Sequence, residues 1–426
     1  MGGQAVSLLG SGLVQFAIIW YVTMRANSGT SMMIITLASF LPQLVVAPFA
    51  GVWADRYDRR WLTILSDGSI ALVTLALMIA FIAGYESIWM IYVVAAIRSF
   101  GGGIQSPAIS ALIPQITPKS DLVRVNGVYN TINNVLLLLS PMLGGAMLTL
   151  FPMWTVFLVD VVTAAVAIVI LMFLPIPDFN TGVVRNGFGR EKTLKPGQVW
   201  GFPTKEEYEA AEAEKGLDES TETGGRQFKK GLVYVRGNRL VRNLMATYAV
   251  FMMLLAPVAI LTPLYIRRHF GIEPWRITAT QTALFAGMAV GGVFVSIKGR
   301  FKSHLTTIRT SGFIVAGLTM GLAFLGIFQS STFTLFAFLA FCLGTVVPFY
   351  TTAVTTLFQE KVEAQYHGRV FAILFMIGSA AIPLGTVIFG PLADIFPIEN
   401  LLAVTSGLQL LLLVFSWKTL PRRYED

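Results

Sequence analysis

Long apolar runs alternate with short polar ones along almost the whole chain. Windows of about 20 apolar residues, the length with which a helix crosses a bilayer, recur twelve times. We expect membrane spans at 2–24, 32–54, 62–83, 88–111, 122–149, 153–173, 243–266, 277–297, 306–327, 332–357, 366–390 and 399–417. The first run is too long for a cleavable signal peptide and has no basic region before it, so we expect it to remain as a span. Because the chain begins inside that span without a polar lead, we expect its start to be truncated or misassigned.

Composition agrees with a membrane protein that crosses the bilayer many times. Hydrophobic residues make up 55% of the 426 residues and charged residues only 13%, whereas soluble domains carry about 25% charge. The mean hydropathy is +0.69. The net charge of +8 is concentrated in one set of loops, which membrane orientation requires, so we expect the lipid bilayer and not nucleic acid as a partner. The single cysteine, Cys342, lies in an apolar run and is expected to be a packing residue.

Charged loops set the predicted orientation. Arg56, Arg59 and Arg60 gather in the turn between the second and third spans, which the positive-inside rule places in the cytoplasm. With that turn fixed, 26 Lys and Arg fall on the cytoplasmic side, and four fall on the opposite side: Arg25, Arg267, Arg268 and Arg276. We therefore expect a multi-pass protein of the cell membrane, plasma or inner, with both termini cytoplasmic.

An internal repeat relates the two halves of the chain. A single offset of 241 residues superposes five Gly or Pro positions: Gly51 on Gly292, Gly103 on Gly344, Pro107 on Pro348, Gly127 on Gly368 and Gly144 on Gly385. We expect an all-α integral membrane protein of twelve transmembrane helices in two pseudo-symmetric six-helix halves, 1–174 and 243–417. Transporters built from parallel repeats place the substrate at the interface of the halves.

Between the halves lies a polar linker, 175–242, and a cytoplasmic tail follows at 418–426. The linker carries twelve Lys or Arg. A capping box at Thr204 to Glu207 predicts a short helix that continues to Lys215, and 216–226 is expected to be disordered. Apolar residues then alternate with basic ones at helical spacing from Phe228 to Arg236, which is typical of a helix on the inner leaflet. A linker without a role in transport is the alternative interpretation.

The turn after the second span carries the most specific motif. Its residues read G-x-x-x-D-R-x-x-R-R, and this order resembles the loop between spans two and three of the major facilitator superfamily. In that family the acid and the arginines form a network that is made and broken as the halves rock. Asp58 replaces the usual central glycine and leaves the pairing open; a plain orienting loop is the alternative. The resemblance implies a conformational network of Gly51, Asp55, Arg56, Arg59, Arg60 and Asp121, which Asp67 is expected to join.

Two charged residues lie deep inside predicted spans. Arg98 is near the bilayer centre, where an arginine costs about 2.5–3.5 kcal/mol on insertion scales. Its surroundings resemble the span-four motif of the superfamily, while its repeat mate is Leu339, so the shared fold does not need the charge. It either pairs structurally with a neighbouring span or takes part in substrate or proton coupling. Asp160 would be protonated if unpaired and is a candidate proton site, with a hydrogen-bonded structural acid as the alternative.

Further candidates come from spans four, five, seven and ten. A row of asparagines on nearly one face of span five either lines a cavity or forms interhelical hydrogen bonds: Asn130, Asn133 and Asn134. Ser140 to Gly145 resembles the G-P-x-x-G-G signature of exporter branches of the superfamily, and close helix packing is expected at Gly103, Pro107, Pro141, Gly144 and Gly145. The resemblance also implies cavity-lining roles for Tyr248, Tyr265 and Tyr350.

No enzymatic chemistry is indicated. His269, His304 and His367 are far apart in sequence, and there is no Walker loop, nucleophile elbow or cysteine pair. We expect no catalytic residue, metal or cofactor, and a proton gradient as the energy source.

The resemblance covers nearly the whole chain. The opening Gln4 to Ser11, the stretch Phe16 to Trp20 and the span that contains Asp160 look like the macrolide-efflux and siderophore-exporter branch. This implies a monomeric, proton-coupled exporter of amphipathic small molecules, drug-like or macrolide-like, that works by alternating access. Export of an endogenous siderophore or lysolipid is the alternative within transport. A transport-inactive membrane sensor or scaffold is the alternative from another class.

Overall fold

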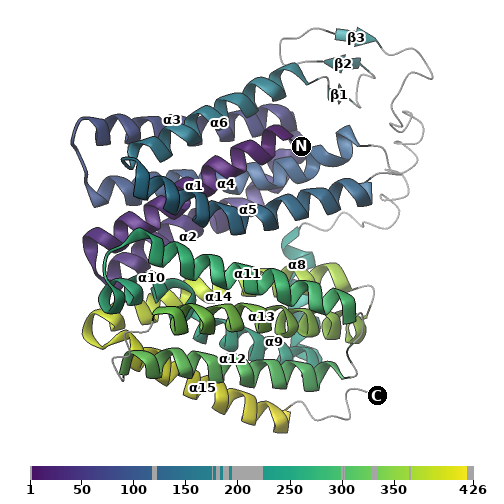
Figure 1. Cartoon of the computed structure of the whole chain (residues 1–426). Coiled ribbons are helices and arrows are strands. Elements are labelled where there is room, and N and C mark those ends of the chain that lie inside the picture. Colours follow the sequence, from purple (N-terminus) through teal and green to yellow (C-terminus); the bar gives the residue numbers. More distant parts are fainter. Residues whose placement is uncertain are drawn as a thin grey trace. The chain divides into compact units, whose positions relative to one another are not determined.

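The computed structural model describes residues 2–117, 122–174, 176–178, 183–185, 191–193, 224–298, 301, 303–327, 333–363 and 366–419. Six helices form the first half (Figure 1): α1 (Gly2–Ala26), α2 (Gly29–Arg56), α3 (Arg59–Ile82), α4 (Ile88–Ile116), α5 (Leu122–Leu150) and α6 (Trp154–Phe173). The helices of the second half are α9 (Arg239–Leu254), α10 (Ala256–Phe270), α11 (Pro274–Lys298), α12 (His304–Ile327), α13 (Phe333–Lys361), α14 (His367–Ile395) and α15 (Ile398–Thr419). Within unbroken apolar runs, helices satisfy every backbone group internally, as a bilayer demands.

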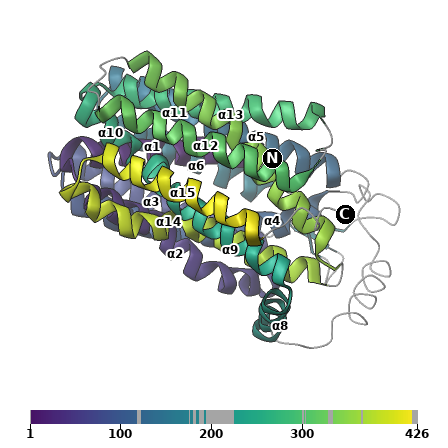
Figure 2. The ribbon, with the colours of Figure 1, turned by 90° about the horizontal axis from the view of Figure 1, so that it is seen from below.

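The predicted all-helical membrane architecture is confirmed. Eleven stretches among the described residues are long and apolar enough to cross a membrane. The twelfth predicted span is α5; within its described residues, Leu139–Leu150 forms a shorter apolar stretch. In the second half, α13 packs between α11 and α12, and α15 packs on α12 (Figures 1 and 2).

The chain forms two compact units. Unit 1 comprises 1–18 and 37–221, and unit 2 comprises 19–36 and 222–426. The segment 19–36, which the sequence repeat assigns to the first half, therefore packs with unit 2. Its attachment is specific, because the Asp394 carboxylate accepts hydrogen bonds from the backbone N–H groups of Gly29 (2.6 Å) and Thr30 (2.9 Å). An anionic group is favoured there, since α2 begins at Gly29 and its first N–H groups have no partner within the helix.

The repeat offset of 241 residues also relates helix contacts. A Cβ atom added to Gly103 of α4 would lie 2.9 Å from the Cα of Gln43 in α2. A Cβ added to Gly344 of α13 would overlap the carbonyl oxygen of Leu284 in α11. The contacted positions 43 and 284 are separated by the same 241 residues. The glycines that align in sequence thus allow the corresponding pair of helices to approach closely in each unit.

The span expected at 243–266 is confirmed as Arg239–Phe270, but it is not one continuous helix. It consists of α9 and α10, which meet at Leu255, with Pro257 in the first turn of α10. Proline has no N–H group, so the carbonyl of Met253, four residues earlier, loses its helical partner. Gly385 of α14 faces this carbonyl, and a Cβ there would overlap the Met253 oxygen. The missing side chain lets α14 approach the break.

The linker contains structure that its composition did not predict. Three short strands, β1 (Ile176–Asp178), β2 (Val183–Arg185) and β3 (Glu191–Thr193), form an antiparallel sheet in the order β1-β2-β3. The predicted helix near 228–236 is confirmed as α8 (Gly224–Gly237), whose start shows that 224–226 are helical and not disordered. The predicted helix at 204–215 and the rest of the predicted disordered stretch lie outside the described residues.

Candidate functional site

The first part of the site is an ion pair buried among the helices of unit 1. Arg98 of α4 is 8% exposed and Asp160 of α6 is fully buried, and the Arg98 Nη1 pairs directly with the Asp160 Oδ2. The hydroxyl of Thr74 in α3 accepts from the same guanidinium and lies 3.1 Å from the Asp160 Oδ2. Ser11 of α1 donates to the Asp160 Oδ1 at 3.1 Å. Asp160 is therefore not an unpaired carboxylate, because Arg98 pairs with it.

The second part of the site is another buried acid. Asp67 of α3 is 2% exposed. Its Oδ1 accepts from Ser7 (3.1 Å) and Gln105 (2.5 Å), and its Oδ2 accepts from the amide of Gln4 (3.2 Å). These donors come from α1 and α4 and carry no charge. The assignment of Asp67 to the network of Asp55 and Arg59 is therefore wrong.

Both acids belong to one polar column along the same helices. The column consists of Gln4, Ser7, Ser11, Asp67, Thr74, Arg98, Gln105 and Asp160. Asp67 and Thr74 are seven residues apart on α3, and Arg98 and Gln105 are seven residues apart on α4. Seven residues make about two helical turns, or about 10.5 Å, and return a side chain to the same face. The spacing therefore places Asp67 and its donors about two turns from the Arg98–Asp160 pair, along the junction of α1, α3 and α4.

The column has no counterpart in unit 2. The offset of 241 residues maps its members onto Met245, Tyr248, Met252, Ile308, Val315, Leu339, Val346 and Leu401. None of these residues is charged near neutral pH, and Arg98 and Asp160 both correspond to leucine. Because unit 2 builds the same helix arrangement without the column, the fold does not require it.

The turn that carries the predicted conformational network lies between α2 and α3. Asp58, which stands at the usual glycine of the motif, caps α3 through a hydrogen bond from the Arg60 N–H at 2.8 Å. Arg59 donates to the Ala111 carbonyl near the end of α4 (3.0 Å), and Arg60 donates to the Leu174 carbonyl after α6 (2.7 Å). Both arginines thus hold the start of α3 against the ends of neighbouring helices. Gly51 lies within α2, while the side chains of Asp55, Arg56 and Asp121 lie outside the described part of the chain.

Span five packs closely on α1 in unit 1. A Cβ atom added to Gly144 would lie 2.8 Å from the Phe16 ring, and one added to Gly12 would overlap the Ser140 hydroxyl. Pro141 lies inside α5, as Pro107 lies inside α4. The Gly145 carbonyl accepts from Thr149 (2.7 Å). Of the asparagine row, Asn133 donates to the Tyr129 carbonyl of its own helix (2.9 Å), while the side chains of Asn130 and Asn134 lie outside the described part.

The three candidate tyrosines lie in the aromatic core of unit 2. Tyr350 stacks on Phe251 with ring centroids 4.3 Å apart and lies 6.4 Å from Tyr248. Tyr265 stacks on Phe336 at 5.0 Å, and its hydroxyl donates to the Leu322 carbonyl at 3.3 Å. Tyr265 and Tyr350 are almost completely buried. Packing in the core accounts for these contacts.

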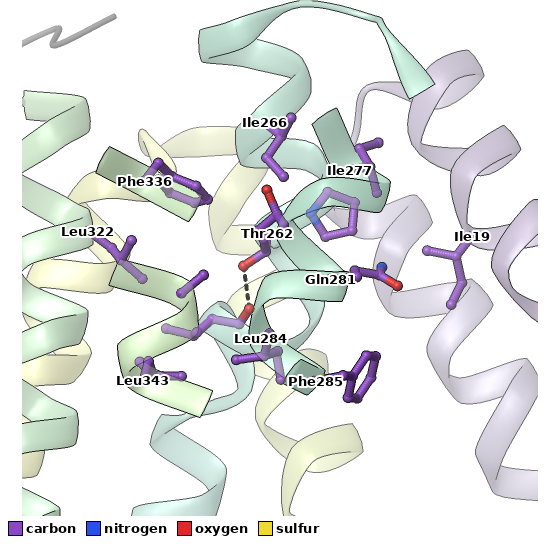
Figure 3. Close-up of a pocket in the computed structure, with 15 residues that line it drawn as sticks. Ile19, Thr262, Ile266, Ile277, Gln281, Leu284, Phe285, Leu322, Phe336 and Leu343 are labelled. Carbon is purple, nitrogen blue, oxygen red and sulfur yellow. Dashed lines mark hydrogen bonds between the residues drawn. The ribbon is translucent and has the colours of Figure 1, made fainter. Parts of the chain in front are cut away.

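Unit 2 contains a small cavity that the sequence did not predict (Figure 3). Its volume is about 200 Å³, and its walls are formed chiefly by α10, α11 and α13. Thr262, Thr280 and Gln281 are the polar residues among mostly aliphatic and aromatic neighbours. The Thr262 hydroxyl is bonded to the Val258 carbonyl of its own helix, which leaves Gln281 as the amide on this wall. Because ligand pockets usually measure about 300–1,000 Å³, the cavity accommodates only part of a drug-sized molecule.

Eleven candidate membrane spans among the described residues, two sequence repeats and a buried Arg–Asp pair within the helices of the first repeat are together typical of a membrane transporter. The model of the Major Facilitator Superfamily matches residues 1–386, and the chain belongs to that superfamily. It is similar to macrolide efflux protein A of Streptococcus pyogenes, with 27% identity over 92% of this chain and 88% of that protein. It is also similar to the multidrug efflux pump Tap of Mycobacterium tuberculosis, with 23% identity over 90% of this chain and 84% of the pump.

Solved structures share the fold. A bacterial homologue of the iron transporter ferroportin superposes with a TM-score of 0.65 over 99% of this chain and 97% of that chain, at 14% identity. The family, its efflux relatives and this fold identify a transporter and not an enzyme.

Proposed function

We propose that the protein exports amphipathic small molecules, of the drug-like or macrolide-like class, in exchange for protons by alternating access. It works as a monomer in the plasma or inner membrane, with both termini in the cytoplasm. The observation that carries the proposal is the buried Arg98–Asp160 pair, which unit 2 replaces by Leu339 and Leu401. Buried pairs seldom add stability over apolar residues of similar size, so a pair kept in one repeat only favours a functional role.

Proton exchange requires a group that changes its protonation state within the membrane. Arginine remains charged throughout, so Arg98 cannot carry the proton and acts electrostatically on a carboxyl. The polar column contains two carboxyls, and Arg98 pairs directly with one of them, Asp160. We assign coupling to the column as a whole, with Arg98 and Asp160 as its charged centre.

The substrate class rests on the relatives and on the apolar character of unit 2. Proteins named for macrolide efflux and multidrug efflux align with at least 90% of this chain. The cavity beside Gln281 offers apolar walls and one amide, which suits an apolar group next to a hydrogen-bonding atom. It would receive one portion of a larger amphipathic molecule.

A screen in an efflux-deficient bacterial host tests this proposal. Cells that express the protein are expected to tolerate higher concentrations of one or more macrolides or other amphipathic drugs than cells with the empty vector. A protonophore at a concentration that leaves growth intact should remove most of the difference in drug accumulation. Equal accumulation with and without the protonophore would contradict proton coupling. No change for any amphipathic compound, at proven expression, would contradict the substrate class.

A further inference from the structure

We propose that Asp67 is the proton-binding group of the polar column and that the Gln4 amide reverses its hydrogen bond when Asp67 is protonated. This inference names the coupling acid and rests on the proposed function for its role in transport. The proton-binding step itself is a property of unit 1 and can be measured without a substrate.

The surroundings of Asp67 favour a proton more than those of Asp160. Among the residues that the structure describes, Asp67 contacts only uncharged donors, whereas Asp160 is paired with Arg98. A carboxylate removed from water without a cation is costly, and protonation removes that cost. Asp160, in contrast, already has a guanidinium as its direct partner.

Other charged groups near α3 do not change this conclusion. Residues 4–18 of α1 include no charged side chain, and the only charged residues of α4 and α6 are Arg98 and Asp160, which neutralise one another. Arg59 and Arg60 lie about two turns from Asp67 on its own helix and donate to backbone carbonyls at the helix ends. With Asp67 ionised the column carries one net negative charge, and with Asp67 protonated it is neutral. A neutral column is easier to keep away from water during the conformational cycle.

Gln4 supplies a second, independent observation. It is 8% exposed, and its Nε2 donates to the Asp67 Oδ2, yet its Oε1 is buried and has no hydrogen-bond partner among the described residues. A protonated Oδ2 becomes a donor and needs an acceptor. A half-turn of the Gln4 amide brings Oε1 to that position. One Gln4–Asp67 hydrogen bond therefore persists in both states with its direction reversed.

Protonation of Asp67 affects contacts among three helices. Ser7 and Gln105 donate to the Asp67 Oδ1, so α1 and α4 are both tied to α3 through this carboxyl. Hydrogen bonds to an ionised acceptor are about twice as strong as neutral ones, and protonation weakens both. The proton comes from bulk water and returns to it, while the Arg98–Asp160 pair stays intact. Protonation of Asp67 thus loosens α1 and α4 from α3 at one level of the column.

Infrared difference spectroscopy on the purified full-length protein in lipid nanodiscs tests the inference. Acidification of the wild-type protein should produce a carbonyl band of a protonated buried carboxyl. Asp67→Asn should lose this band, and Asp160→Asn should keep it. A band that persists at full intensity in Asp67→Asn, or that vanishes in Asp160→Asn instead, would overturn the assignment.

Variants that leave Asp67 in place keep the test valid if Asp67→Asn fails to fold. Gln4→Leu removes the acceptor and should shift the band to higher frequency. The matched control is Gln15→Leu on the same helix, because Gln15 donates to Ser39 (3.2 Å) and not to the column, and it should leave the band unchanged. An unshifted band in Gln4→Leu would overturn the role of Gln4.

Export measurements on Asp67→Asn distinguish a failure of this inference from a failure of the proposed function. Asp67→Asn should lose at least tenfold in proton-driven export of a macrolide such as erythromycin while retaining exchange without a gradient. If the Asp67 band titrates but no compound is exported, the proposed function fails and the proton site stands. If export remains proton-driven in Asp67→Asn, the assignment to Asp67 fails and the proposed function stands.

Discussion

Asp160→Leu is expected to yield a poorly stable protein whose stability returns when Arg98→Leu is added, without the return of export. The single change leaves the Arg98 guanidinium, 8% exposed, without its carboxylate. Removing one partner of a buried pair costs about 3–5 kcal/mol, whereas replacing both partners by apolar residues is often neutral or stabilising. The second repeat provides a natural model of the double variant, because it has Leu339 and Leu401 at the corresponding positions.

Thermal unfolding and export, measured at matched expression, complete this double-mutant cycle. We expect both single variants to unfold at lower temperature than the wild type and the double variant to recover most of the loss. Export should be lost in all three. Recovery of export in the double variant would show that the pair serves stability alone, and an unchanged unfolding temperature in Asp160→Leu would contradict the buried ion pair.

Gly291→Ala is the other change with a large expected effect. A Cβ atom at Gly291 in α11 would overlap the carbonyl oxygen of Thr345 in α13, and one at Gly287, a turn earlier, would overlap that of Phe341. Backbone atoms cannot rotate away as a side chain can, so α11 and α13 must separate. We expect a loss of about 3 kcal/mol, at the upper end of what overpacking costs. Small residues matter here because helices in lipid associate by close packing.

The neighbouring glycine provides the matched control. A Cβ atom at Gly292 meets nothing within 4 Å. Gly292→Ala should therefore be neutral or gain up to about 1 kcal/mol, since alanine favours the helix over glycine. Unfolding of the purified variants in detergent measures both values. Equal stability of the two variants would contradict the close contact between α11 and α13.

The helices could be predicted from the sequence because their signals are local. Apolar windows located all eleven candidate spans found among the described residues, and the offset of 241 residues anticipated the matching contacts of Gly103 and Gly344. The break in span seven also has a local signal, Pro257, which the apolar window concealed. The small sheet in the linker and the cavity beside Gln281 have no comparable signal.

The candidate site was only partly predictable. The sequence identified Arg98 and Asp160 as buried charges but could not show that they pair, because 62 residues separate them and the pairing depends on how α4 and α6 pack. Asp67 was misassigned for the same reason, since two of its partners lie 63 and 38 residues away. A usable signal was the seven-residue spacing of polar positions in otherwise apolar helices, which places Asp67 with Thr74 and Gln105 with Arg98 on common faces.

Proton-driven transport by the purified protein tests the central claim most directly. The wild-type protein and the Arg98→Leu/Asp160→Leu variant are reconstituted into liposomes, a pH gradient is imposed at zero membrane potential, and movement of a labelled macrolide is followed. The account predicts accumulation against the macrolide gradient by the wild type, its collapse on addition of a protonophore, and no accumulation by the double variant. Accumulation that is independent of the pH gradient, or equal in the two proteins, would contradict it.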